Sequence, residues 1–250
     1  MSRRSLLMGL DVGTTHIKGI LYDPATGDVV SQCRDLTPGY SPRPGWTECD
    51  PIKLWRRVRA CISVLVSSLS EGNRIEAVAA ATMGESGTLY DKEGNPLYPI
   101  IAWFDPRTQP QEQWWLANYD VQITGHRVKF TYGVNQIMWL REHLPDMYAQ
   151  ADRWLGVHDM VVWKLSGVSA TDHSIASRAM LLDQQLGDWS DELLQIANLP
   201  RELLPRVHPS GQVVGRVTRE AAAETGLPSG TPLVTGGHDH LCAALACGCT

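Results

Sequence analysis

Residues 6–22 read LLMGLDVGTTHIKGILY, two short apolar runs separated by a polar turn. Short apolar runs bounded by Gly, Asp, Thr or Pro are typical of strands joined by tight turns. A third run, at 29–34, follows directly. We therefore expect the chain to open with a β-meander.

The rest of the chain alternates helices and strands, which indicates an α/β protein. Asp50 before Pro51 is typical of a helix start, and apolar residues then recur at helical spacing, so we expect an amphipathic helix over 51–70. The last strand should deliver Gly236-Gly237-His238-Asp239-His240 into a helix that begins at Leu241. Further helices are expected at 108–116, 135–144, 155–165 and 219–224, and further strands at 75–83, 87–91, 213–217 and 232–235.

The composition argues against a nucleic-acid-binding or membrane-spanning protein. The net charge is −5 and the pI is near 5.9, whereas binding to nucleic-acid phosphates requires a basic face. No apolar stretch of the sequence approaches the roughly 20 residues that span a bilayer. The six cysteines lack zinc-ribbon spacing and the density of a disulfide scaffold. We expect reduced thiols and a cytoplasmic location, and the sequence leaves open whether the protein is a homodimer.

The first candidate site is the turn after the first strand. Gly13 allows close approach of the backbone to a ligand, consecutive turn amides can bind an anion, and the hydroxyls of Thr14 and Thr15 add donors. Lys18 supplies a positive charge nearby. Asp11 suits a phosphate site only if Mg²⁺ lies between the two negative groups. The alternative is an ordinary hairpin turn; the pattern is neither a Walker A loop nor a Rossmann fingerprint.

The second candidate site is Asp239, which follows two glycines at a strand end. A carboxylate there can accept the proton of an alcohol during phosphoryl transfer. The alternative is that Asp239 only caps the following helix. His238 and His240 flank it, and we interpret them as contacts to substrate hydroxyls or as pocket walls rather than as metal ligands, because spacing indicates no distant third ligand.

These two ends belong to one ordered series of motifs that resembles the FGGY family of carbohydrate kinases, which includes xylulokinases, glycerol kinases and gluconokinases. The resemblance runs along essentially the whole chain. Between Gly9-Leu10-Asp11-Val12-Gly13-Thr14-Thr15 and Gly236-Gly237-His238-Asp239 lie Trp103-Phe104-Asp105-Pro106-Arg107, Thr171-Asp172, Ala176-Ser177-Arg178, Trp189-Ser190 and Leu199-Pro200.

The resemblance implies an actin-like ATPase (ribonuclease H-like) fold, with a mixed sheet flanked by helices, and the use of ATP and Mg²⁺. It implies that residues 1–250 form the N-terminal domain, which binds the sugar and carries the first phosphate loop. The nucleotide-binding domain would then lie outside this chain, and the isolated chain should be inactive.

The resemblance also implies roles for single residues. Asp11 would be the magnesium-associated carboxylate, Gly13, Thr14, Thr15 and Lys18 the phosphate contacts, and Asp239 the catalytic base. The family places sugar-binding residues at the position of Met83-Gly84-Glu85, but this stretch matches neither common family pattern.

Three further residues are candidate substrate contacts, and each has an alternative role. Glu85 and Trp103 are candidate contacts to the sugar, the alternatives being a surface carboxylate and a core tryptophan. Asp105 is a candidate contact that could equally well pair with Arg107.

The predicted activity is ATP-dependent phosphorylation of a hydroxyl on a ketose or polyol. The alternatives are another actin-like ATPase and a non-catalytic sugar-binding or sensing protein of the same fold.

Overall fold

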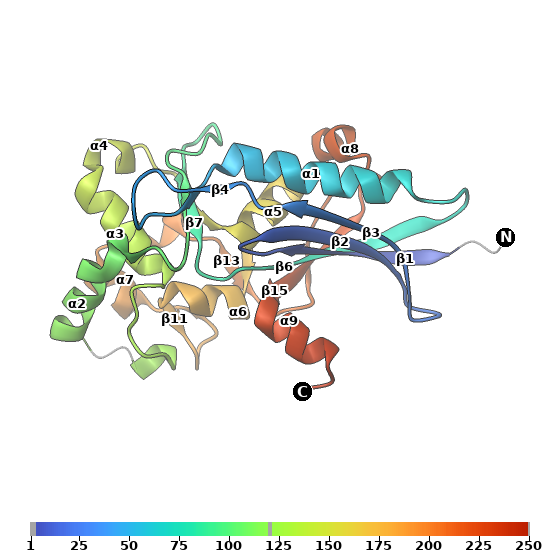
Figure 1. Cartoon of the computed structure of the whole chain (residues 1–250). Coiled ribbons are helices and arrows are strands. Elements are labelled where there is room, and N and C mark those ends of the chain that lie inside the picture. Colours follow the sequence, from blue (N-terminus) through green and yellow to red (C-terminus); the bar gives the residue numbers. More distant parts are fainter. Residues whose placement is uncertain (1–3, 120–121, 250) are drawn as a thin grey trace.

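The computed structural model describes residues 4–119 and 122–249. Its largest sheet has the strand order β14-β15-β6-β1-β2-β3 (Figure 1). The predicted β-meander is confirmed, because β1, β2 and β3 pair as antiparallel neighbours. These strands are β1 (Ser5–Val12), β2 (His16–Asp23), β3 (Asp28–Leu36), β6 (Arg74–Thr82), β14 (Val213–Arg216) and β15 (Pro232–His238).

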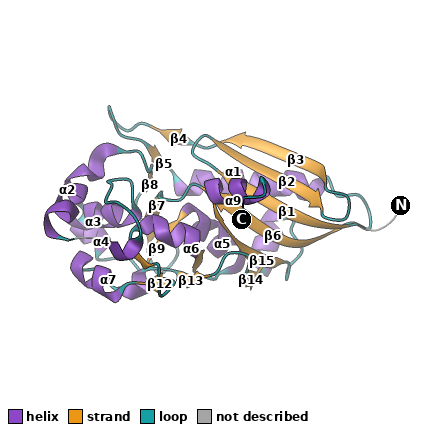
Figure 2. Cartoon of the chain, turned by 90° about the horizontal axis from the view of Figure 1, so that it is seen from below, coloured by secondary structure: helices purple, strands orange, loops and turns teal. Residues whose placement is uncertain are grey.

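The sheet is mixed, because the strands in its middle pair in parallel whereas those of the meander pair antiparallel. Strand β6 pairs in parallel with β1 on one side and with β15 on the other. Thr82 is the register partner of both Val12 and His238. The carboxyl ends of three strands from distant parts of the sequence therefore end at one level of the sheet (Figure 2).

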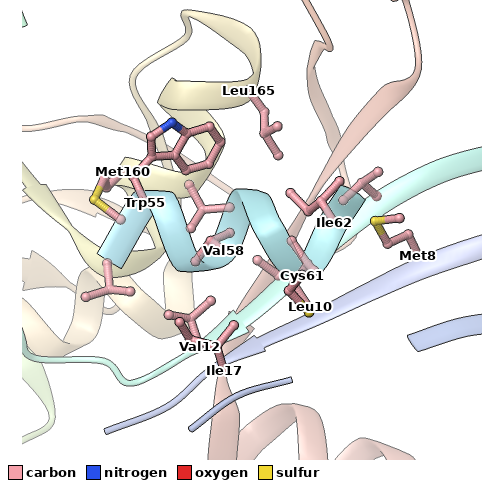
Figure 3. Close-up of a cluster of buried hydrophobic side chains, with 14 of the residues drawn as sticks. Met8, Leu10, Val12, Ile17, Trp55, Val58, Cys61, Ile62, Met160 and Leu165 are labelled. Atoms are coloured by element: carbon pink, nitrogen blue, oxygen red, sulfur yellow. The ribbon is translucent and has the colours of Figure 1, made fainter. Parts of the chain in front are cut away.

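Helix α1 (Pro51–Ser67) covers one face of the sheet, and α9 (Asp239–Ala246) lies on the other (Figure 1). The side chain of Asp50 caps α1 and Pro51 occupies its first turn, as predicted. Figure 3 shows Val58 and Ile62 of α1 facing the apolar side chains of the sheet. Gly19 is required for this close packing, because a Cβ there would lie 2.8 Å from Leu65 Cδ1.

The prediction that this helix extends to residue 70 was wrong by three residues. The helix ends at Ser67, where Ser68 Oγ donates a hydrogen bond to the carbonyl of Leu65. Gly72 then adopts a left-handed conformation, with φ at 85°, and turns the chain into β6. The Ser68 hydroxyl thus bonds a carbonyl of the last turn, a group that the amide of another helical turn would otherwise bond.

The second part of the molecule surrounds a separate apolar core that includes Trp115, Leu140 and Trp189. Its sheet has the order β4-β5-β8-β7-β9. The strands are β4 (Gly39–Tyr40), β5 (Glu48–Cys49), β7 (Gly87–Tyr90), β8 (Ile100–Ile101), β9 (Arg153–Gly156), and the short pairs β10 (Ala170–Asp172) with β13 (Arg206–His208) and β11 (Leu182–Asp183) with β12 (Asp188–Trp189). The helices on this side include α2 (Gln109–Asn118), α3 (Gly133–His143), α4 (Pro145–Tyr148), α6 (His173–Ala176) and α7 (Asp191–Ala197). Helices α5 (Val157–Ser166) and α8 (Arg219–Thr225) contribute instead to the core under the main sheet.

The predicted helix at 155–165 begins two residues later than expected. Leu155 and Gly156 belong to β9, where they pair with Thr88 and Gly87 of β7. The apolar run is continuous across this junction, so its periodicity could not separate a buried strand from the helix that follows. Within the described part of the chain, no helix has the length and apolar character that crossing a bilayer requires.

Strand β15 is longer than predicted and runs through Gly236 and Gly237 to His238, so that α9 begins at Asp239 rather than at Leu241. A Cβ on Gly236 would lie 2.0 Å from the carbonyl oxygen of Ala80 on β6. The strand can therefore pass this point next to β6 only with glycine.

We predict that Gly236→Ala lowers the free energy of unfolding by about 2–3 kcal/mol, because the backbone of β6 must move to accept the new methyl group. Gly39→Ala is the matched control, since its Cβ would meet Glu48 O at an ordinary 3.8 Å. Denaturant unfolding of both variants measures the difference. Equal stability of the two variants would show that β6 and β15 can separate without cost.

Candidate active site

The first candidate loop is the turn between β1 and β2. The amide of Gly13 donates to the carbonyl of His16 (3.0 Å), and Thr37 Oγ1 donates to the carbonyl of Gly13 (2.7 Å). The Gly13 amide is thus used within the turn, whereas Thr14 and Thr15 are exposed. The segment is a hairpin turn, and a role in binding phosphate stays a prediction.

Asp11 and Lys18 are register partners across β1 and β2. Lys18 Nζ lies 3.0 Å from Asp11 Oδ2, and their side chains are 52% and 37% exposed. Mg²⁺ prefers oxygen ligands and commonly binds through one or two carboxylates, with water and phosphate completing its shell. The accessible Asp11 carboxylate fits such an ion, and Lys18 supplies the compensating charge beside it.

Asp239 is the first residue of α9, and His238 occupies the cap position without a side-chain capping bond. Asp239 Oδ1 accepts from the amide of the next residue, His240, at 2.7 Å. The alternative prediction that Asp239 is the helix N-cap was therefore wrong. Its carboxylate is 31% exposed, and His238 Nδ1 lies 3.3 Å from it.

The backbone just before Asp239 is held by a buried carboxylate. Asp172 accepts from the amides of Ser174 (3.1 Å) and Ile175 (3.0 Å) and from the hydroxyls of Ser174 and Ser210. Ser174 Oγ in turn accepts from the amide of His238 at 2.8 Å. Asp172 belongs to the ordered motif series of the sequence, whereas the two serines follow it at no diagnostic spacing and were not predicted.

One cavity of about 210 Å³ is lined by Thr14 of the first candidate site and by Asp239 of the second. Asp11, Gly13, Thr15 and Lys18 are not among the described residues that line it. Residues 83–85 extend from β6 into its wall, between the β1–β2 turn and the start of α9. The predicted residues Thr14, Glu85, Trp103, His238, Asp239 and His240 line the cavity together with Met83, Gly84 and Arg178.

Trp103 is not a core tryptophan and Glu85 is not a surface carboxylate, while their contact with a substrate stays a prediction. Trp103 is 38% exposed rather than a core residue, and its Nε1 donates to Thr14 Oγ1 at 3.1 Å. The Glu85 side chain is only 14% exposed and is therefore not an ordinary surface carboxylate. Both side chains face the cavity that Asp239 lines.

Burial shifts the ionisation of two groups in the cavity. It raises the pKa of Glu85, and the charge of nearby Arg178 partly opposes this rise. Burial lowers the pKa of His238 and so favours a neutral imidazole, whereas the negative charge of Asp239 opposes this shift. Arg178 was predicted only as part of the Ala176-Ser177-Arg178 motif, and its position in the cavity lining was not predicted.

The charges of Asp11 and Asp239 both affect the pKa of one thiol, although the two residues are distant in the sequence. The pKa of Cys242 in α9 is raised by burial and then by the charges of Asp172, Asp239 and Asp11. Both candidate carboxylates therefore lie within electrostatic reach of one thiol on the α9 side of the sheet.

Asp105 does not line this cavity. Its side chain is fully buried and forms a two-point ion pair with Arg107, with distances of 2.9 Å to Nε and 2.7 Å to Nη2. Burial alone would raise the pKa of Asp105, but hydrogen bonds from Arg107 and from the amide of Thr47 lower it. Arg107 also binds Glu48 at 2.7 Å. Of the two roles predicted for Asp105, the structure has the pairing with Arg107.

The model for the FGGY family of carbohydrate kinases, N-terminal domain, matches residues 6–246. The chain belongs to this family. It is 31% identical to L-fuculokinase of Escherichia coli strain K12 over 249 residues, which cover 95% of this chain and 51% of that protein. It is 33% identical to a glycerol kinase of Limosilactobacillus reuteri, covering 86% of this chain and 45% of that protein.

The structure of xylulose kinase from Rhodospirillum rubrum superimposes with a TM-score of 0.93 at 31% identity, covering 98% of this chain and 51% of that one. The predicted fold class is thereby confirmed as the actin-like ATPase fold of FGGY kinases. The chain spans about half the length of the curated relatives it matches. Because these relatives are kinases, the two rival predictions, another actin-like ATPase and a non-catalytic sugar-binding protein, are not favoured.

We predict that Arg107→Met destabilises this FGGY domain by about 3–5 kcal/mol, because it leaves the buried carboxylates of Asp105 and Glu48 without their cation. Arg57→Met is the control, since it removes an exposed ion pair with Asp35 and should change stability little. Denaturant unfolding measures both variants. A small effect of Arg107→Met would mean that water reaches the buried carboxylates.

Proposed function

We propose that this chain is the sugar-binding half of an ATP-dependent carbohydrate kinase that phosphorylates a hydroxyl of a ketose or polyol. The observation that carries the proposal is the shared cavity, which Thr14 of the turn after β1 and the carboxylate of Asp239 at the start of α9 line together. The named activities of the fuculokinase, glycerol kinase and xylulose kinase relatives support the same reaction class.

In this proposal Asp239 accepts the proton of the attacking hydroxyl while the hydroxyl oxygen bonds to the γ-phosphorus of ATP and the bond from that phosphorus to the β-phosphate oxygen breaks, which releases ADP. Thr14, Thr15 and Lys18 donate to the phosphate oxygens. Asp11 would hold Mg²⁺, which neutralises phosphate charge when bound. Trp103 offers a flat apolar surface to the sugar ring or chain, and Glu85 accepts hydrogen bonds from its hydroxyls.

The domain arrangement is part of the proposal. The adenine pocket and the remaining phosphate contacts would belong to a second domain that the 250 residues do not contain. We also propose a cytoplasmic location, where ATP and Mg²⁺ are available and the six thiols stay reduced. The 250-residue chain by itself should then turn over poorly.

We predict that Asp239→Asn in the full-length protein lowers kcat about 10²–10⁴-fold, because an amide cannot accept the hydroxyl proton. Coupled ATP-consumption assays with a panel of ketoses and polyols measure this loss. Glu192→Gln, an exposed change on α7, is the control and should retain wild-type turnover. Near-normal turnover by Asp239→Asn would remove the base assignment.

We predict that Ser174→Ala in the full-length protein lowers kcat about 10–100-fold with little change in KM, because the His238 amide loses its acceptor and the adjacent carboxylate moves. Ser174→Thr keeps the hydroxyl and should recover most of the activity. A purely structural role would instead lower the thermal stability of Ser174→Ala and leave its kcat unchanged.

A further inference from the structure

Gly84 lies in the cavity wall, within the stretch Met83-Gly84-Glu85 that matches neither common family pattern fully. Gly84 has no side chain, and a Cβ there would lie 2.2 Å from His238 Cδ2 and 2.6 Å from Arg178 Cγ. His238 and Arg178 therefore occupy the space that a residue 84 side chain would need. The polar groups of this wall come from α6–β11 and β15 rather than from residue 84 itself.

Arg178 is held beside the cavity by an incomplete set of partners. Its Nε lies 3.5 Å from Glu85 Oε1, and its Nη2 donates to Tyr132 Oη at 3.3 Å. The Arg178 Nε atom is buried and makes no hydrogen bond with good geometry within the described part of the chain. The guanidinium is thus held in place by few partners, and the Arg178 side chain, 23% exposed, lines the cavity.

The charges around the cavity do not favour an acidic ligand. Glu85 and Asp239 contribute two carboxylates to the described lining, and Arg178 contributes the single Lys or Arg cation. The Glu85 carboxylate lies 3.5 Å from that cation and offsets its charge at short range. A sugar that carries a carboxylate would meet net negative charge in this cavity, which costs free energy.

We propose that the Glu85–Arg178 pair makes this site select uncharged ketoses or polyols against the corresponding sugar acids, and that Glu85 is the residue that sets this choice. The inference rests on the proposed kinase function and adds its substrate class. Glu85 accepts from substrate hydroxyls and cancels the charge of Arg178. Without the negative charge of Glu85, the charge of Arg178 is no longer offset and attracts a ligand carboxylate.

The test compares substrates that differ only in the acid group: xylitol with xylonate, and sorbitol with gluconate. The full-length protein is assayed as wild type and as Glu85→Gln, with kcat/KM from ATP consumption and Kd from calorimetry. Glu85→Gln should raise kcat/KM for the acid by about tenfold or more, and should strengthen binding of the acid likewise. No gain for the acid in both measurements overturns the proposal.

Two further variants separate charge from shape. Glu85→Asp keeps the negative charge and should show no gain for the acid, whereas Glu85→Gln combined with Arg178→Gln should lose the gain. An equal gain in either variant overturns the role of the ion pair. Thermal unfolding checks that each protein is folded, and Glu85→Ser replaces Glu85→Gln if the latter is not.

The outcomes also separate this inference from the function on which it depends. Wild-type turnover of a neutral substrate without any gain in Glu85→Gln refutes the selectivity inference alone. Absence of wild-type turnover and binding for every ketose and polyol in the panel refutes the proposed kinase function and the inference with it.

Discussion

The site depends on the parallel pairing of β6 with β1 and β15. This pairing brings Val12 and His238 to the same level on either side of Thr82. Adjacent strands are about 4.8 Å apart, so residues on the two flanking strands lie roughly 10 Å from each other. Such spacing suits a reaction that joins a phosphate group held at one strand end to a hydroxyl held at the other. Gly236 makes the pairing sterically feasible, because it passes against the backbone of β6.

Four aspartates fall into two groups that differ in how many hydrogen bonds their carboxylate oxygens accept. Asp105 and Asp172 are buried, and hydrogen bonds from several donors satisfy them. Asp11 and Asp239 are about one-third exposed and retain oxygen lone pairs that face solvent. Only the second group can bind a cation or accept a proton without breaking the fold, because removing a partner from a buried carboxylate is costly.

The cavity lies where the two apolar cores approach each other. Met83 belongs to the core under the main sheet, and Ala179, next to Arg178, belongs to the core of the second part. Its polar groups are therefore held from both sides: Asp239 through the bond from His238 to Ser174, and Arg178 through Tyr132. A small displacement between the two parts would change the distance between the base and the groups that orient the substrate.

The sequence by itself determined the meander, the capped helix α1, the family, and most residues of the cavity, because these follow from local periodicity, turn chemistry and ordered motifs. Only the tertiary structure decided that Asp105 is structural, that Asp239 is not a helix cap, and that Ser174 and Arg178 belong to the site. The physical reason is distance along the chain. Arg107 bonds Glu48, 59 residues away, and His238 bonds Ser174, 64 residues away. A local sequence pattern cannot show which carboxylate or hydroxyl oxygens such long-range hydrogen bonds occupy.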